Sequence, residues 1–156
     1  MGISIEHSGI QRGELRDILL LWEEARADKR RPPPVERFAP TELTPFLSHM
    51  IFAEVEPGMS RIRYRAVGVE LSRIYGEDLA GRYLDEMPRL FRTFAEPAYR
   101  EVLDRRDATY GSFRFVENWW IATYERLMLP LVDAEGQIVE IAVAMFPRIT
   151  KRGAEP

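Results

Sequence analysis

The sequence predicts an α+β fold: a five-stranded antiparallel sheet with helices on one face, preceded by an N-terminal helical extension. Three observations favour this fold. Residues 124–146 have the pattern of a β-hairpin, in which two apolar segments flank a loop that ends in Gly136. Two shorter strand-like segments lie nearer the N-terminus, and helical segments separate them from the hairpin. Strands on both sides of a helical middle favour an antiparallel sheet covered by helices.

Composition indicates one domain and excludes several classes of site. A chain of 156 residues buries roughly 68–70% of its unfolded surface, which is enough for a core without covalent staples. The net charge of -3 argues against general nucleic-acid binding. The chain has no cysteine, which excludes disulfides, thiolate-held zinc, iron–sulfur clusters and a cysteine–flavin adduct. No segment has the length and apolarity of a membrane span, and the first residues lack a signal-peptide pattern, so we expect a cytoplasmic protein.

The N-terminal extension is predicted to be a helix over residues 13–27. Its apolar face includes Leu15, Ile18, Leu19 and Trp22, at the spacing of one helical face. A face this wide predicts packing on the sheet of the same domain or on a second protomer. Three prolines at 32–34 then favour a stiff connector. The expected organisation is therefore the helix and connector at 1–37, the main domain at 38–150 and a frayed tail at 151–156.

The remaining elements follow from apolar spacing and from the positions of glycine and proline. The predicted strands are residues 49–55, 61–67, 110–116, 121–132 and 138–146. The predicted helices are a short one that starts near Pro40, residues 68–75 closed by Gly76, a single turn at 85–87, and residues 97–106.

Three stretches of the chain together resemble a PAS domain. The first runs from Trp22 through the prolines to Leu47, the second is residues 64–82 with Gly68, Gly76 and Gly81, and the third is residues 124–150. The set is most similar to the bacterial single-domain group called the PAS_5 family and covers roughly residues 15–150. The resemblance implies a sensory or interaction module that acts in signal transduction, forms a homodimer and has no output domain of its own.

The same resemblance implies a cavity between the sheet and its helices, with Val67 facing it. Strand alternation would then direct Arg65 into the cavity, paired with an internal carboxylate such as Glu125 or Asp78, or with a ligand carboxylate. In a third interpretation, Arg65 faces away from the cavity. The other candidate pocket residues are Tyr75, Phe113, Phe115 and Met128, although ordinary core packing also explains the last three.

Candidate interaction residues are the apolar face of the N-terminal helix (Leu15, Ile18, Leu19 and Trp22) and Trp120 at the turn between two later strands. The two histidines, His7 and His49, are 42 positions apart and have no spacing typical of a metal site. We therefore expect neither a metal nor a haem, and no cofactor is indicated.

The sequence thus favours a PAS-like module that binds a small molecule, docks to a signalling partner, or does both, without nucleic-acid or membrane binding. One alternative is a small α+β enzyme that uses the same cavity, although no catalytic motif is present. The other is a ligand-free dimerisation module with a filled core.

Overall fold

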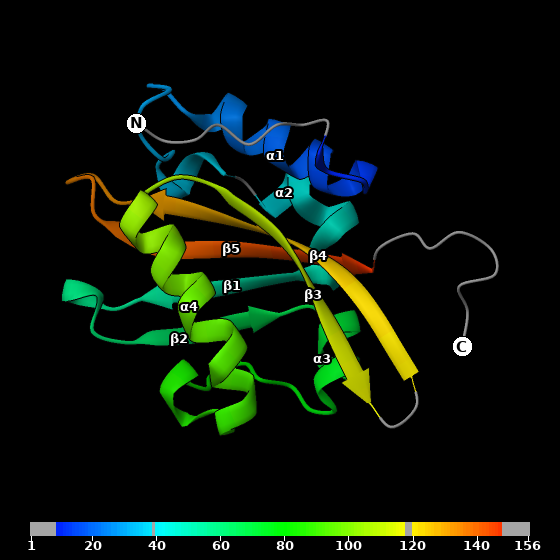
Figure 1. Cartoon of the computed structure of the whole chain (residues 1–156). Coiled ribbons are helices and arrows are strands. Elements are labelled where there is room, and N and C mark those ends of the chain that lie inside the picture. Colours follow the sequence, from blue (N-terminus) through cyan, green and yellow to red (C-terminus); the bar gives the residue numbers. More distant parts are fainter. Residues whose placement is uncertain (1–8, 39, 118–119, 148–156) are drawn as a thin grey trace.

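Five antiparallel strands form one sheet in the spatial order β2-β1-β5-β4-β3 (Figure 1). The architecture comes from a computed structural model that describes residues 9–38, 40–117 and 120–147. The strands are β1 (Met50–Val55), β2 (Ile62–Val67), β3 (Thr109–Glu117), β4 (Trp120–Val132) and β5 (Ile138–Pro147). The two strands that are nearest the termini in sequence, β1 and β5, lie side by side at the centre of the sheet.

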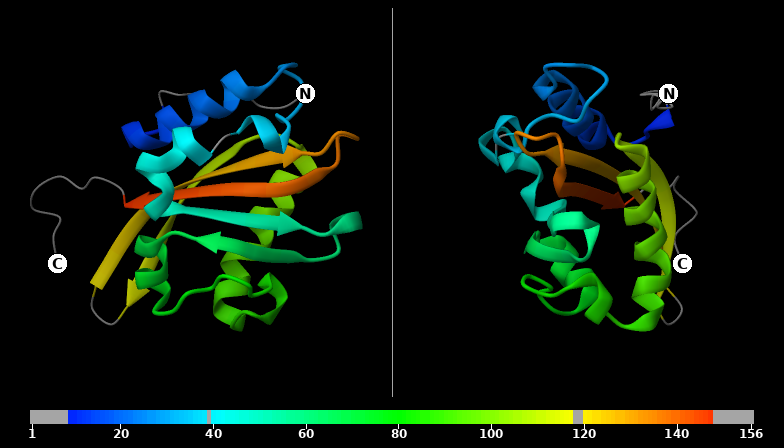
Figure 2. Two further views of the ribbon diagram at one scale, coloured as in Figure 1. Left: turned by 180° about the vertical axis from the view of Figure 1, so that it is seen from behind. Right: turned by 90° about the vertical axis from the view of Figure 1, so that its left-hand side faces the viewer.

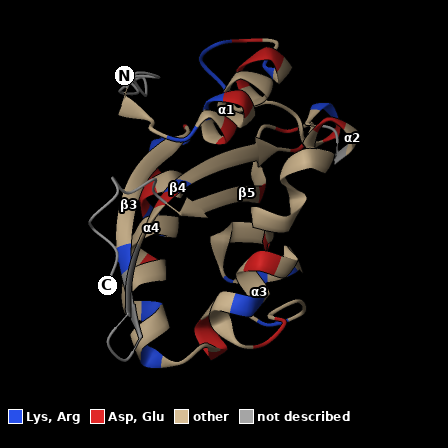
Figure 3. Cartoon of the chain, turned by 90° about the vertical axis from the view of Figure 1, so that its right-hand side faces the viewer, with Lys and Arg blue, Asp and Glu red and all other residues tan. Residues whose placement is uncertain are grey.

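Helical segments cover both faces of this sheet. Figure 2 shows α1 and α4 on opposite sides of it, with α2 on the α1 side. The α-helices are α1 (Gly13–Ala25), α2 (Pro40–Leu43), α3 (Val69–Tyr75) and α4 (Arg89–Arg105). The 3₁₀ turns are η2 (Val35–Arg37), η3 (Thr44–His49), η4 (Pro57–Met59) and η5 (Leu84–Glu86). Charged residues gather mainly on helices and loops, and the strands are largely uncharged (Figure 3).

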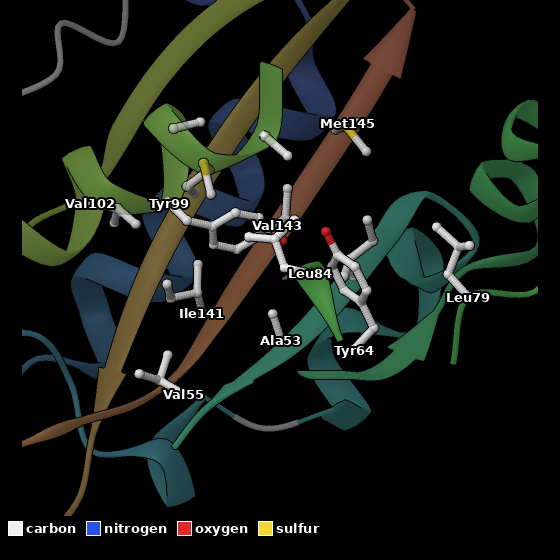
Figure 4. Packing of buried hydrophobic residues seen from close by; sticks show 14 of the residues in the cluster. Ala53, Val55, Tyr64, Leu79, Leu84, Tyr99, Val102, Ile141, Val143 and Met145 are labelled. Carbon is white, nitrogen blue, oxygen red and sulfur yellow. The ribbon is translucent and has the colours of Figure 1, made fainter. Parts of the chain in front are cut away.

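Each face of the sheet has its own apolar core, because side chains of a strand alternate between the two faces. On β5, Ile141, Val143 and Met145 face the layer formed by α3, η5 and α4, and the intervening residues face α1. Figure 4 shows the first core, where Tyr99 and Val102 of α4 lie over the sheet. The second core joins α1 to β4 and β5.

The strands agree with the sequence prediction to within a few residues, whereas the longest helix does not. Residues 97–106 were expected to be helical, but α4 begins at Arg89 and contains Pro97 in its interior. Proline removes one backbone hydrogen bond of a helix. Pro97 is exposed, whereas Ala95, Ala98 and Tyr99 are buried against the sheet. The burial of this face outweighs the missing bond, which local sequence rules do not weigh.

The N-terminal extension packs on the sheet of its own chain, which is one of the two places expected for it. Leu15, Ile18, Leu19 and Trp22 are each at most 1% exposed. The connector joins the sheet as well, since the amide of Val132 donates a 3.0 Å hydrogen bond to the carbonyl of Pro33. Among the described residues, no helix has the length and apolarity needed to cross a bilayer.

Candidate functional site

A pocket of about 460 Å³ lies between the first half of α4 and the β3–β4–β5 part of the sheet. Its walls are mostly apolar, and two arginines are the charged groups among them. The lining residues are Tyr75, Pro88, Leu90, Phe91, Phe94, Ala95, Phe113, Arg114, Arg126 and Met145. This size and this lining are typical of a small-molecule site in a protein.

Aromatic rings hold one wall of the pocket in place. Tyr75 is the last residue of α3, which ends because Gly76 has the left-handed φ of 76°. The ring of Tyr75 meets that of Phe91 edge-to-face at 5.1 Å, and Phe91 makes a similar contact with Tyr64 at 6.5 Å. Burial raises the pKa of Tyr75 to about 12, so its phenol stays neutral at physiological pH.

Arg126 on β4 is the pocket's most distinctive polar group. Its guanidinium carbon lies 5.3 Å from the centre of the Phe113 ring, a cation–π contact. Within the described parts of the chain, no ion pair or hydrogen bond of this guanidinium is present. Desolvation by burial lowers the pKa of Arg126, and the nearby Tyr99 and Tyr75 only partly oppose that effect. The pocket therefore contains a partly buried cation that no carboxylate of the described residues neutralises.

The expected pocket residues separate into three groups. Tyr75 and Phe113 line the pocket. Met128 is 2% exposed within the first core, Val67 packs against that core, and neither of them lines the pocket. Phe115 belongs to β3, but its side chain lies outside the described residues.

The expected orientation of Arg65 is wrong, because a β-bulge interrupts the alternation of β2. Phe52 pairs with Ala66, and Ala53 pairs with Tyr64, so Arg65 is an extra residue without a partner on β1. Val67 faces the first core as expected, but so does Tyr64. A one-residue shift transfers every side chain beyond it to the other face.

Arg65 instead lies on the face of the sheet that carries α1. Its Nη2 atom donates a 2.5 Å hydrogen bond to Oε1 of Glu140, and its guanidinium lies 5.2 Å from the Phe52 ring. The arginine side chain is 47% exposed and that of Glu140 is 10% exposed. The expected internal carboxylate is therefore present, but it is neither Glu125 nor Asp78 and it is remote from the pocket.

The expected interaction surface also needs correction. The apolar face of α1 (Leu15, Ile18, Leu19 and Trp22) is buried in the second core, so it is not available to another molecule. The side chain of Trp120 lies outside the described residues. Large exposed apolar side chains occur instead on α4, where Leu90 is 74% exposed and Phe94 is 61% exposed. Both residues also line the pocket.

Sequence reasoning missed Arg126 and the first half of α4. Leu90, Phe91 and Phe94 were missed because the helix was expected to start only at Pro97. The position of Arg126 could have been predicted from the sequence. It stands two positions before Met128, so strand alternation puts both side chains on one face of the sheet.

His49 is remote from this pocket. His49 ends η3, stacks on Phe146 with ring centres 4.4 Å apart, and so lies on the α1 side. Within residues 9–38, 40–117 and 120–147, no group of three or more potential metal ligands comes together.

Comparison with known proteins supports a PAS-like fold. No family model and no curated protein matches the sequence. The PAS domain of Bordetella pertussis BvgS matches with a TM-score of 0.53 and 16% identity, over 66% of this chain and 77% of that one. A light-oxygen-voltage domain, solved in a study of a flavin analogue, matches with a TM-score of 0.51 and 13% identity, over 71% of this chain and 84% of that one. The chain therefore has a PAS-like α+β fold, as the sequence predicted, whereas membership of the PAS_5 family stays a prediction.

Proposed function

We propose that this protein is a PAS-like sensory module, not an enzyme, and that it binds a small molecule in the pocket between α4 and the sheet. The occupied pocket would then alter how the domain contacts a signalling partner. The fold supports the general role, since the similar solved structures are PAS and light-oxygen-voltage domains. The proposal also includes a cytoplasmic location, which the absence of disulfide-forming cysteines supports.

The observation that carries the proposal is the pocket itself. Its volume of about 460 Å³ falls within the range of roughly 300–1,000 Å³ that is common for small-molecule sites. Its walls come from α3, α4 and three strands, so a bound molecule would contact both layers of the domain. Such a ligand could shift the position of α4 relative to the sheet by binding one arrangement more tightly than another.

A substitution that fills the pocket tests this function. Ala95 lines the pocket and is 9% exposed, so Ala95→Phe should occupy the space of a ligand. The matched control is Ala80→Phe, at an exposed loop position outside the pocket. Native mass spectrometry of protein purified from its own host should show a bound small molecule in the wild type and in the control but not in Ala95→Phe. A wild-type protein without any bound molecule, or equal occupancy in all three proteins, would contradict the proposal.

A second candidate function, docking through α4, has its own observation. Leu90 and Phe94 are four positions apart on one side of the helix and are highly exposed. We propose that this side of α4 forms the contact with a second copy of the chain. Light scattering should give a dimer mass for the wild type and a monomer mass for Phe94→Asp. Leu20→Asp, at a 48% exposed leucine of α1, serves as the control and should leave the mass unchanged.

A ligand-free dimerisation module would give a different pair of results. It would show the change of mass with Phe94→Asp and no molecule bound to the purified wild type. The two experiments together therefore separate a sensor from a purely structural dimer.

A further inference from the structure

The charge inside the pocket indicates the chemical class of the ligand. We propose that Arg126 binds the carboxylate of a small, singly charged acid with an apolar body. This inference rests on the proposed function and deepens it by naming the ligand class. It depends on three observations: the isolation of the guanidinium, the neutrality of its surroundings and the apolar walls around it.

The first observation concerns the ion-pair partners of the Arg126 guanidinium. Several other arginines of the domain have carboxylate partners, such as Asp85 for Arg61 at 2.7 Å and Glu140 for Arg65 at 2.5 Å. Arg126 has no such partner among the described residues. A partly buried charge is costly unless it is paired, so an unpaired one is expected where a ligand supplies the counter-charge.

The second observation concerns the charge of the groups around Arg126. The groups that act on Arg126 are the phenols of Tyr64, Tyr75 and Tyr99 and the carboxylate of Glu101. Burial raises the pKa of each of these phenols, so they stay neutral. Glu101 is paired with Arg105 on α4, at 3.4 Å. No anion of the described chain therefore competes with a ligand for the guanidinium.

The third observation concerns the walls of the pocket. Met145, Phe91, Ala95 and Phe113 surround the pocket with hydrocarbon, which favours an aliphatic or aromatic ligand body. The planar fork of an arginine matches a carboxylate, to which it can donate two parallel hydrogen bonds. Arg114, the other arginine of the lining, is exposed to solvent. One partly buried cation in apolar surroundings favours a monoanion over a dianion, whose second charge would lose its water without gaining a partner.

Matched pairs of acid and amide provide the test. Octanoate and phenylacetate would be titrated calorimetrically at pH 7.5 against octanamide and phenylacetamide, which have nearly the same shape but no charge. The wild type should bind each acid at least about tenfold more tightly than its amide, as expected for a charge-assisted hydrogen bond. Arg126→Gln should remove this preference by weakening acid binding roughly 10- to 100-fold, while changing amide binding about twofold or less.

Two controls isolate the role of Arg126. Arg16→Gln changes an exposed arginine of α1, on the far side of the sheet, and should leave all four affinities unchanged. The melting temperature of ligand-free Arg126→Gln should equal or exceed that of the wild type, because the empty protein loses a charge that has no partner. If Arg126→Gln fails to fold, or melts well below the wild type, the guanidinium has a structural role and the proposal is wrong. Arg126→Lys should fold and bind the acids more weakly than the wild type, since it keeps the charge without the fork.

The possible outcomes also separate this inference from the proposed function. If acids and amides bind equally well and Ala95→Phe abolishes both, the pocket is a ligand site but the carboxylate assignment is wrong. If Arg126→Gln leaves acid binding intact, the anion binds elsewhere and the assignment is again wrong. If none of the four probes binds, the proposed class is overturned, whereas native mass spectrometry still decides whether the pocket holds another molecule.

Discussion

The indole nitrogen of Trp22 donates a 3.0 Å hydrogen bond to the carbonyl oxygen of Pro130, which is 108 positions away in the sequence. The bond joins α1 to β4 inside the second core, where Trp22 is 1% exposed. A buried hydrogen bond of this kind requires both partners, because neither group can form a hydrogen bond with water instead. Helix α1 is thereby joined to the sheet by a directional bond as well as by apolar packing.

Loss of this bond should lower the free energy of unfolding. Trp22→Phe retains an aromatic ring but leaves the buried carbonyl of Pro130 without this donor, at an expected cost of about 1–3 kcal/mol. Leu20→Ala, at a 48% exposed position of the same helix, should change stability by about 0.5 kcal/mol or less. Urea denaturation of the two variants measures both effects. Equal stability of Trp22→Phe and the wild type would show that the bond contributes nothing.

The ion pair between Arg65 and Glu140 should contribute less than a fully buried pair. Because the arginine side chain is 47% exposed, a double-mutant cycle with alanine at each position should give a coupling energy of about 1 kcal/mol. Truncation of one partner in a fully buried pair would instead cost roughly 3–5 kcal/mol.

The surface pair of Arg73 and Glu70, at 2.7 Å on α3, is the matched control for that cycle. Its coupling should be about 0.2–0.5 kcal/mol, because it is a solvated pair on one helix. A larger coupling for the control than for Arg65 and Glu140 would contradict the interpretation.

A close backbone approach makes Gly68 irreplaceable. A Cβ atom at this position would lie 2.3 Å from the carbonyl oxygen of Leu47 and 2.4 Å from that of Ser48. The neighbours are backbone atoms, so Gly68→Ala should destabilise the domain by about 3 kcal/mol or more, or prevent folding. Gly13→Ala, where an added Cβ meets nothing within 4 Å, should be neutral or stabilise α1 by up to about 1 kcal/mol. Thermal melts of both variants test this expected difference in stability, and a Gly68→Ala protein as stable as the wild type would refute this account.

The stability of the domain should fall slightly in mildly acidic solution because of His49. Burial lowers the pKa of His49 from the ordinary value of 6.5. The unfolded chain therefore binds a proton more readily than the folded domain, so the stabilising contribution is present above pH 6.5 and is lost as the pH falls below it. NMR titration of the His49 ring should give a pKa below 6.5, with His7→Gln used to assign the two histidine signals. His49→Gln should weaken the loss of stability between pH 7.5 and 5.5, and a measured pKa above 6.5 would reverse the expectation.

Local signals were enough to identify most elements of this protein. Alternating and helical apolar spacing located α1 and all five strands to within a few residues, because burial of one face imposes that spacing on the chain. The glycines at 76 and 136 marked the end of α3 and the last hairpin turn, and both have positive φ angles. The PAS-like order of elements followed from these signals.

Three features depend on contacts between distant segments and were decided only by the tertiary structure. The bulge at Arg65 arises where β1 and β2 pair, and it reverses the face on which that arginine lies. The continuation of α4 through Pro97 arises from packing on the sheet. Arg126 is isolated because the tertiary structure brings none of the described carboxylates within ion-pair distance of it. The sequence by itself determined the elements and their order, since these depend on neighbouring residues. The outward orientation of Arg65 and the absence of a carboxylate partner for Arg126 depended on register and on long-range pairing, which no local pattern contains.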